Sequence, residues 1–302
     1  MIRTRRLGIC GSDVSFYLGH RAVSYPLTLG HEVLGTVDTA GDGVTKFAPG
    51  QRVVVEPNYV CGTCRFCRSG RGNICPSKQS MGVTLPGCFA DYAVAPAEFV
   101  WTVPDSIDDA DAAAIEPLAV SVHALSQSGA QPGDTVAVVG CGVVGLLLTH
   151  VAASMGIRVL AYDRVSGKAA MARALGADTP ASAGIAAVWL SENVTTVFEC
   201  AGTPAAVEFV IASAPRGSRV LLLGLATHPA SFVPLRLVRE GIRIEPSLIY
   251  DHPSDFARTI ALVANGTLRP SKVVGATLPL DSIRGAMELA SEGQTGKVQL
   301  TV

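Results

Sequence analysis

A short apolar run that ends in three closely spaced glycines constrains the fold of this chain more than any other feature. The run begins at Val136, and Gly140, Gly142 and Gly145 follow it with the spacing G-x-G-x-x-G. Between a strand and a helix, the first glycine permits a tight turn, the second lets the backbone approach a pyrophosphate, and the third lets the helix pack closely. Residues 136–145 therefore predict the start of a dinucleotide-binding fold, and an ordinary glycine turn of an α/β protein is the alternative.

The residues after the glycines fit a nucleotide-binding fold. Residues 146–155 are apolar and small, as in a helix under a sheet, and residues 157–162 read as a second strand. Asp163 follows about 20 residues beyond the motif, where a carboxylate can hold the ribose hydroxyls of NAD. The same carboxylate repels the 2′-phosphate of NADP, although the adjacent Arg164 softens that preference. The candidate cofactor-binding residues are Gly140, Gly142, Val143, Val144, Gly145, Asp163 and Arg164.

Length and charge limit the class of protein. The chain has 302 residues, 48% of them hydrophobic, which is enough for two domains with a large core. Its formal net charge is -1. A nucleic-acid or membrane partner usually requires a basic face, so neither is expected. We find no signal-peptide core after Met1 and no apolar run near the roughly 20 residues that span a bilayer. The expectation is a cytoplasmic protein.

The order of strands and helices predicts an α/β protein with two domains. Short strands separated by glycine and proline fill the first part, which we expect to form a mainly β barrel. Strands and helices alternate in the middle, which predicts a Rossmann doubly wound parallel sheet. The expected domains are 1–116 for the first part of the β domain, 117–256 for the nucleotide domain, and 257–302 for a return segment that completes the β domain.

Four clustered cysteines predict a metal site. Cys61, Cys64, Cys67 and Cys75 have the spacing C-x2-C-x2-C-x7-C. Four thiolates so close together can close tetrahedrally on one zinc ion, which leaves no open position and makes the site structural. The alternatives are an iron–sulfur cluster, which four cysteines also suit, and four free thiols.

A second set of potential metal ligands is dispersed along the chain. Cys10, His31, Glu32 and Glu116 supply one thiolate, one imidazole and carboxylates. Each alone is more often an ordinary core or turn residue. Together they offer three ligands and one open position, as a catalytic zinc ion requires.

In this order along the chain, the motifs resemble the zinc-dependent medium-chain alcohol dehydrogenases. The likeness rests on Gly-Ile-Cys-Gly-Ser-Asp at 8–13, Gly-His-Glu at 30–32, the four cysteines, Glu-Pro-Leu-Ala-Val at 116–120, and the glycine motif. Glu-Pro-Leu, where classical members place a third zinc-binding cysteine, is similar to the polyol branch, which includes sorbitol and butanediol dehydrogenases. The resemblance implies that the β domain is GroES-like.

The resemblance also implies roles for individual residues. Cys10 and His31 would bind the catalytic zinc directly, and Glu32 or Glu116 would complete its shell. The four clustered cysteines would hold a structural zinc, and Ser12 would pass the substrate proton outward. The implied reaction is reversible hydride transfer from a secondary alcohol or polyol to NAD, giving the ketone, with the substrate between the two domains.

Several alternatives stay open at this point. An amino-alcohol, inosamine or threonine-type dehydrogenase of the same family would carry the same zinc ligands, and a cofactor-binding sensor without turnover is a hypothesis of a different class. Relatives assemble as homodimers or homotetramers, which we expect here too. Phe16 and Tyr17 follow the ligand loop and either line the substrate pocket or pack into the core.

The chain departs from the family in two places. Many relatives carry a histidine five residues after the first zinc-binding cysteine, where this chain has Ser15, so the proton path beyond Ser12 differs. Relatives also begin well upstream of that cysteine, whereas Met1 begins inside an apparent strand. We therefore expect the N-terminal strands of the barrel to be missing.

Overall fold

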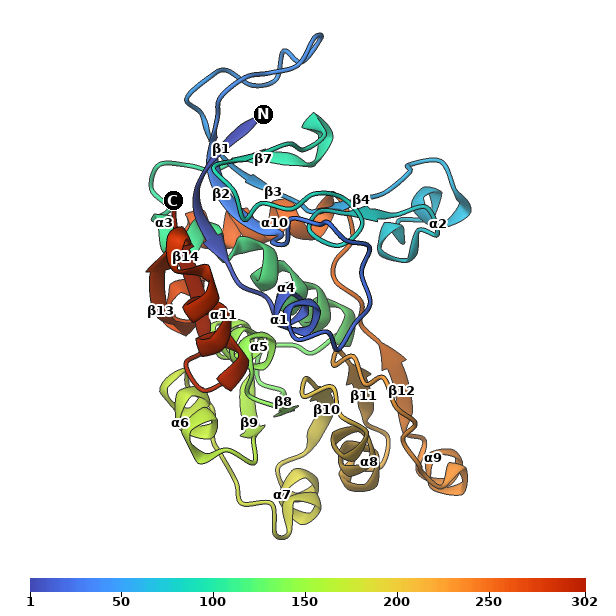
Figure 1. Ribbon diagram of the computed structural model, residues 1–302. Coiled ribbons are helices and arrows are strands. Elements are labelled where there is room, and N and C mark those ends of the chain that lie inside the picture. The colour runs from blue at the N-terminus through green and yellow to red at the C-terminus, as the bar shows by residue number, and fades with distance from the viewer. The chain divides into compact units, whose positions relative to one another are not determined.

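The computed structural model describes residues 1–302, which form two compact units (Figure 1). The first unit combines Met1–Ala119 with Tyr250–Val302, and the second unit is Val120–Ile249. The sequence placed the two boundaries at 116/117 and 256/257.

The segment 250–256 belongs to the first unit because its side chains bond there. The Tyr250 hydroxyl donates a hydrogen bond to Glu116, and the His252 ring contacts the Glu56 carboxylate. These buried polar contacts bring the chain back into the first unit at its second boundary.

A seven-stranded sheet forms the first unit. Its order is β13-β14-β1-β2-β3-β7, with β6 paired to β1, and its pairs are antiparallel except β13 with β14. The strands are β1 (Ile2–Gly8), β2 (Glu32–Val37), β3 (Arg52–Val55), β6 (Tyr92–Ala93), β7 (Val100–Thr102), β13 (Val274–Pro279) and β14 (Lys297–Thr301). A separate pair, β4 (Asn58–Tyr59) and β5 (Gln79–Ser80), flanks the cysteine cluster.

Short helices and 3₁₀ turns connect these strands. The helices are α1 (Gly11–Tyr17), α2 (Arg65–Arg68), α3 (Asp109–Ala113), α10 (Ser254–Ala264) and α11 (Ile283–Glu292). The 3₁₀ turns are Gly72–Ile74, Ala97–Phe99, Pro270–Val273 and Leu280–Ser282. Helix α4 (Ile115–Ser128) starts in the first unit and continues into the second.

The core of the first unit lies against the sheet. Side chains alternate between the two faces of a strand, so the strands contribute every second residue to the core. Leu7, Val53 and Leu300 are fully buried there, although they come from opposite ends of the sequence. The packing of β1 between β14 and β2 thus joins both stretches of the unit into one core.

The second unit is a parallel sheet of five strands with the order β12-β11-β10-β8-β9. Its strands are β8 (Thr135–Val139), β9 (Arg158–Tyr162), β10 (Val194–Glu199), β11 (Arg219–Leu222) and β12 (Arg243–Pro246). Its helices are α5 (Val143–Ser154), α6 (Ser166–Ala174), α7 (Ile185–Ser191), α8 (Pro204–Ser213) and α9 (Pro234–Glu240). The order reverses beside β8, which creates the switch point at which open α/β sheets bind ligands. The predicted doubly wound parallel sheet is confirmed.

The glycine motif makes the turn from β8 into α5. Gly140 has a φ of +96°, which L side chains rarely adopt. A Cβ atom on Gly145 would lie 1.9 Å from the Gly140 carbonyl oxygen, whereas a Cβ on Gly142 would meet nothing within 4 Å. The first and third glycines therefore serve the turn, and the second keeps the helix N-terminus open.

None of the helices has both the length and the apolar composition needed to cross a membrane.

Replacing Gly145 by Ala should lower the free energy of unfolding by about 1–3 kcal/mol, because the added methyl group overpacks the turn. Urea unfolding followed by circular dichroism measures the change. The matched control is Gly142→Ala, for which we expect an unchanged midpoint because the methyl group has free space. Equal losses in the two variants would contradict this account of the turn.

Candidate active site

Pairing between β1 and β2 builds the first metal-ligating cluster. Cys10 lies between β1 and α1, His31 directly precedes β2, and Glu32 is the first residue of β2. The antiparallel register places Gly8 opposite Glu32, so the chain just beyond one strand meets the beginning of the other. The potential ligand atoms of Cys10, His31 and Glu32 all lie within 4.8 Å of one another. The structure thus brings together three of the four dispersed residues.

Asp13 orients two of these ligands, a role that the sequence analysis missed. Its carboxylate is fully buried and accepts hydrogen bonds from the backbone N–H of Cys10, at 2.8 Å, and of Gly30, at 3.1 Å. It also lies 3.5 Å from His31 Nδ1. Burial lowers the pKa of His31, but the charges of Asp13 and Cys10 outweigh burial and raise it well above its ordinary value. The available signal was the C-x-x-D spacing at the start of α1.

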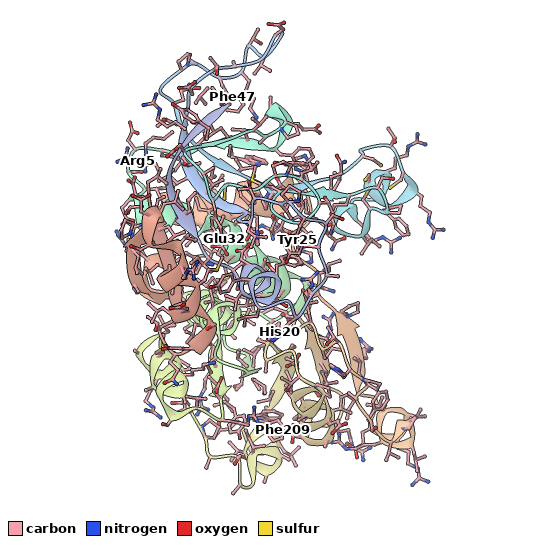
Figure 2. The ribbon with its side chains drawn as sticks, in the orientation of Figure 1. Arg5, His20, Tyr25, Glu32, Phe47 and Phe209 are labelled. Atoms are coloured by element: carbon pink, nitrogen blue, oxygen red, sulfur yellow. The ribbon has the colours of Figure 1, made fainter.

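Lys297 forms a buried ion pair with Glu32, which is itself fully buried. Figure 2 labels Glu32 in the first unit. The lysine is 2% exposed, and its Nζ donates to Glu32 Oε1 and, at 2.9 Å, to the Ile9 carbonyl oxygen. Burial lowers the pKa of Lys297, but Glu32 and Cys10 more than offset it, so the net shift is upward. A charged ammonium group therefore sits beside the cluster. No local pattern pointed to this residue, because it lies 265 positions from Glu32.

Glu116 lies near the cluster but is not among the residues whose ligand atoms all lie within 4.8 Å of one another. It is 7% exposed, at the start of α4, and its Oε1 accepts a hydrogen bond from the Tyr250 hydroxyl at 3.0 Å. Burial raises the pKa of Glu116 to about 7, and the charge of His31 opposes this shift. Burial and neighbouring carboxylates also raise the pKa of Tyr250 well above its ordinary value, so its hydroxyl remains a hydrogen-bond donor. The sequence analysis did not find Tyr250.

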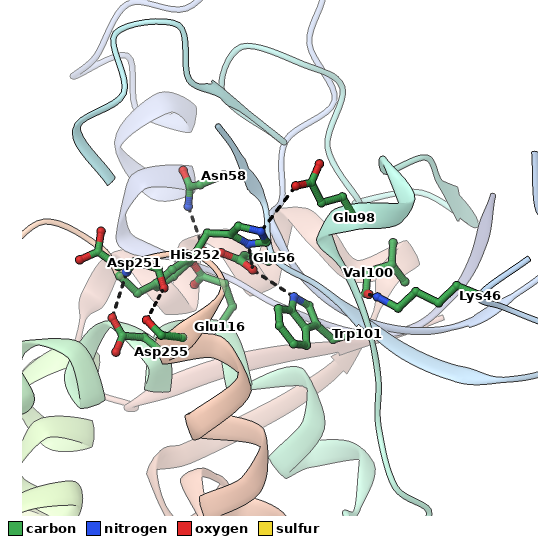
Figure 3. A network of polar contacts seen from close by, with 12 residues as sticks. Lys46, Glu56, Asn58, Glu98, Val100, Trp101, Glu116, Asp251, His252 and Asp255 are labelled. Carbon is green, nitrogen blue, oxygen red and sulfur yellow. Dashed lines mark hydrogen bonds and ion pairs between the residues drawn. The ribbon is translucent and has the colours of Figure 1, made fainter. Parts of the chain in front are cut away.

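Side chains near Glu116 continue this polar network (Figure 3). The Glu56 carboxylate is fully buried, accepts a hydrogen bond from Trp101 Nε1 at 3.0 Å, and lies 2.9 Å from His252 Nδ1. The segment that carries Tyr250 is thereby held at two points, by Tyr250 on Glu116 and by His252 on Glu56.

Helix α1 holds the remaining candidates of the ligand loop. Ser12 lies in its first turn and is partly buried. Phe16 is 2% exposed with the Arg21 guanidinium 4.8 Å from its ring centre, whereas Tyr17 is 45% exposed. Phe16 therefore packs into the unit, which favours the packing interpretation for that residue.

The four clustered cysteines also come together. Their sulfur atoms all lie within 4.8 Å of one another, with Cys61 to Cys67 at 3.9 Å and Cys64 to Cys67 at 3.5 Å. Zinc–sulfur bonds of 2.3 Å in a tetrahedron place the sulfur atoms about 3.8 Å apart. Backbone N–H groups of Thr63 and Cys64 lower the pKa of Cys61 to about 6, which favours the ligating thiolate. The separations suit one ion and are too short for a multi-iron cluster.

The donor set of the first cluster also fits a zinc ion. It offers one thiolate, one imidazole and one carboxylate, the three-ligand arrangement typical of catalytic zinc. Lys297 pairs with Glu32 Oε1, but Glu32 Oε2 is buried without a hydrogen-bond partner. A buried carboxylate oxygen without a donor is costly, and a nearby cation would compensate its charge.

In the second unit, Asp163 closes the glycine turn. It follows β9, and its two carboxylate oxygens accept hydrogen bonds at 2.8 Å from the backbone N–H groups of Cys141 and Val165. Arg164 beside it is exposed, and Gly142, Val143 and Val144 are partly exposed at the start of α5. The predicted cofactor residues thus lie together, around the carboxyl ends of β8 and β9.

Glu199 holds the loop that follows the next strand, and no sequence pattern had pointed to this residue. It ends β10 and is fully buried. One of its oxygens accepts hydrogen bonds from the backbone N–H groups of Ala201 and Gly202, both at 2.8 Å. A Cβ atom on Gly140 would lie 2.5 Å from the Ala201 nitrogen, so these two loops touch at the switch point of the sheet.

Comparison with known proteins identifies relatives of both units. The family model described as an alcohol dehydrogenase GroES-like domain matches residues 1–105, and the one described as a zinc-binding dehydrogenase matches residues 143–265. Sorbitol dehydrogenase of Bacillus subtilis strain 168 is 31% identical over 303 residues, which cover 96% of this chain and 86% of the relative. L-threonine 3-dehydrogenase of the same strain is also 31% identical, with coverage of 99% and 90%.

A solved structure is similar over the whole chain. It is titled a short chain alcohol dehydrogenase (rspB) from Escherichia coli CFT073 complexed with NADH. Its TM-score is 0.92 at 27% sequence identity, and the match covers 100% of this chain and 91% of the other.

Replacing Lys297 by Met should lower the free energy of unfolding by about 3–5 kcal/mol in metal-free buffer, because the Glu32 carboxylate is then left buried and unpaired. Urea unfolding in the presence of a chelator measures the change. The double variant Lys297→Met with Glu32→Gln, which removes both charges, should recover most of the loss. A single variant as stable as the native chain would show that the ion pair contributes nothing.

Proposed function

This chain belongs to the family of zinc-dependent medium-chain alcohol dehydrogenases, and from that premise we propose that it transfers hydride from a secondary alcohol or polyol to NAD, giving the ketone. It is an oxidoreductase of the zinc-binding dehydrogenase family, for which zinc and NAD(P) are the expected cofactors. The observation that carries the proposal is the convergence of Cys10, His31 and Glu32 within 4.8 Å beside the buried Glu116. A sensor without turnover has no need of a three-ligand site with an open position.

We assign the metal sites on the same grounds. Cys10, His31 and Glu32 hold the catalytic zinc, and Glu116 stands outside this set and acts on the site through its charge or a water molecule. A second set holds the structural zinc: Cys61, Cys64, Cys67 and Cys75. When bound, zinc supplies a Lewis acid that polarises an alcohol oxygen, and NAD supplies the hydride acceptor.

The side chains around the site support this chemistry. Asp13 fixes the backbone of the Cys10 loop and faces the His31 ring, and Lys297 balances the charge of Glu32. Ser12 receives the alcohol proton, a role supported by its place in the first turn after Cys10. Ser15 lies on the same helix, so the proton then leaves through that hydroxyl or through water.

The glycine turn and Asp163 bind the dinucleotide. Gly142 leaves the N-terminus of α5 open to the pyrophosphate, and Asp163 holds the ribose hydroxyls. We infer NAD rather than NADP because the Asp163 carboxylate repels a 2′-phosphate. The exposed Arg164 next to it weakens that preference without reversing it.

The substrate class rests on the relatives. A sorbitol dehydrogenase and a threonine dehydrogenase are equally identical to this chain, so a polyol is our first candidate and an amino alcohol of the threonine type is the second. We also propose a cytoplasmic location, because the clustered cysteines suit zinc rather than disulfides, as in a reducing compartment.

We propose that the protein is a homodimer or homotetramer. Four apolar side chains in and before α9 are strongly exposed: Phe232, Val233, Leu235 and Val238. The neighbouring β12 is an edge strand of the parallel sheet. Such an apolar patch beside an unpaired edge is typical of a surface that a second copy of the chain covers.

Replacing Cys10 by Ala should abolish alcohol oxidation and lower the zinc content from two ions per chain to one, while NADH affinity is retained. Elemental analysis, NADH fluorescence titration, and a panel of sorbitol, 2,3-butanediol and threonine with NAD and with NADP measure these effects. The control is Cys88→Ala, which removes a fully buried thiol outside both ligand sets and should keep two zinc ions. Undiminished oxidation by the Cys10→Ala chain would refute the proposed site.

Replacing Val238 by Asp should break the assembly, because a charge would be buried where an 81% exposed apolar side chain meets a second copy. Light scattering after gel filtration should give a multiple of 31.3 kDa for the native chain and about one chain mass for the variant. Val94→Asp, at another strongly exposed valine in the first unit, should leave the mass unchanged. A native chain that runs as a monomer would refute the proposed assembly.

A further inference from the structure

The strand pair next to the four cysteines carries a hydrogen-bonded side-chain pair. Asn58 on β4 and Ser80 on β5 are register partners, and Ser80 Oγ donates to Asn58 Oδ1 at 2.9 Å. We call residues 58–80, from β4 to β5, the cysteine lobe, because all four clustered cysteines lie between these two strands.

The hydrogen bonds continue from the cysteine lobe to Glu116, the buried carboxylate near the cluster of Cys10, His31 and Glu32. Asn58 Nδ2 donates to the Tyr250 hydroxyl oxygen at 2.9 Å, and that hydroxyl donates to Glu116 Oε1 at 3.0 Å. Figure 3 shows Asn58 and Glu116 in one network. Because Asn58 uses the tyrosine oxygen as an acceptor, the hydroxyl proton is directed to Glu116. Each donor in the chain points the same way, an arrangement in which hydrogen bonds strengthen one another.

The hydrogen bonds from Asn58 to Tyr250 and from Tyr250 to Glu116 lie where water has little access. Tyr250 is 2% exposed, and its ring packs against Phe256 with ring centres 5.6 Å apart. Little water can therefore replace Asn58 or Tyr250 as a partner of the buried carboxylate. Without the tyrosine hydroxyl, Glu116 Oε1 would lose the hydrogen-bond donor that fixes its position.

The cysteine lobe has little apolar core of its own. Its helix α2 has four residues and buries none of them, and Ile74 is 40% exposed. A second contact joins the lobe to the Tyr250 segment, because the backbone N–H of Asn73 lies 3.5 Å from Asp251 Oδ1. A segment with so few buried apolar residues depends on metal ligation for its order.

We propose that the cysteine lobe positions the Glu116 carboxylate through Ser80, Asn58 and Tyr250, so that metal in the lobe strengthens metal binding at the catalytic cluster. The inference rests on the proposed function, since it takes both metal sites as given. Asn58 and Tyr250 are positioning residues, because they act on the site only through Glu116. Partners of this kind typically change metal affinity or activity 10- to 100-fold when they are removed.

The first test compares two tyrosine-to-phenylalanine variants. Tyr250→Phe removes the hydroxyl that donates to Glu116, and Tyr59→Phe removes a buried hydroxyl that has no hydrogen-bond partner. Competition with a chromophoric chelator gives the zinc affinity of each site, and cobalt substitution gives an absorption spectrum of the catalytic site. Tyr250→Phe should weaken catalytic-site zinc roughly 10-fold, alter the cobalt spectrum and lower kcat more than it raises KM. Tyr59→Phe should match the native chain in all three.

The second test asks whether the effect comes from the cysteine lobe. Ser80→Ala removes the hydrogen bond from Ser80 to Asn58 and leaves all four cysteines in place. Cys67→Ser removes one metal ligand of the lobe. Each should weaken zinc binding at the catalytic cluster in the same direction as Tyr250→Phe. Each should add no further loss when it is combined with Tyr250→Phe, because the path is already broken. Losses that add in the double variants would overturn the proposal.

The outcomes separate this inference from the proposed function. If the native chain binds one zinc ion, held by the four cysteines, the catalytic site and the coupling both fail. If the native chain binds two and Tyr250→Phe has the affinity and cobalt spectrum of Tyr59→Phe, the coupling alone is overturned.

Discussion

The antiparallel pairing of β1 with β2 is the constraint on which the proposed zinc site of Cys10, His31 and Glu32 depends. It sets Gly8 opposite Glu32 and so brings the Cys10 loop beside His31. A slip of one residue would turn Glu32 to the other face of the sheet, because side chains alternate along a strand. Gly8 is part of the same constraint, since a Cβ atom there would lie 1.9 Å from Glu32 Oε2.

Charge balance favours a cation at the cluster of Cys10, His31 and Glu32. Glu32 and Asp13 are fully buried, Glu116 is 7% exposed, and the Cys10 thiolate would add another negative charge. Lys297 pairs with Glu32, and, against the effect of burial, the charges of Asp13 and Cys10 raise the pKa of His31, so the imidazole supplies a second positive charge when no metal is bound. A divalent ion that binds the thiolate and the neutral imidazole would take over part of this balance. Metal binding and the folded arrangement of the first unit therefore favour each other.

Sequence patterns predicted the sites whose interacting residues lie close together in the sequence. The glycine turn with Asp163 and the four cysteines could be predicted because their spacing alone fixes their geometry, and the doubly wound sheet is confirmed. Residue chemistry marked Cys10, His31, Glu32 and Glu116 as potential ligands, but their individual roles needed the family resemblance. No sequence pattern marked Lys297 or Tyr250, because each bonds to a partner more than a hundred residues away. The segment 250–256 could not be placed for the same reason, since distant contacts hold it in the first unit.

The two proposed metal sites differ in the structure that supports their ligands. Cys10, His31 and Glu32 lie at the ends of β1 and β2, in a sheet whose core side chains, such as Leu7 and Val53, are fully buried. That site can keep its arrangement without metal, because the sheet holds the backbone. The cysteine lobe instead has a four-residue helix, a two-residue strand pair and exposed side chains, so its ligands must supply much of its order. A hydrogen-bond chain from the lobe to Glu116 therefore links the part of the unit that depends most on metal to the part that uses it.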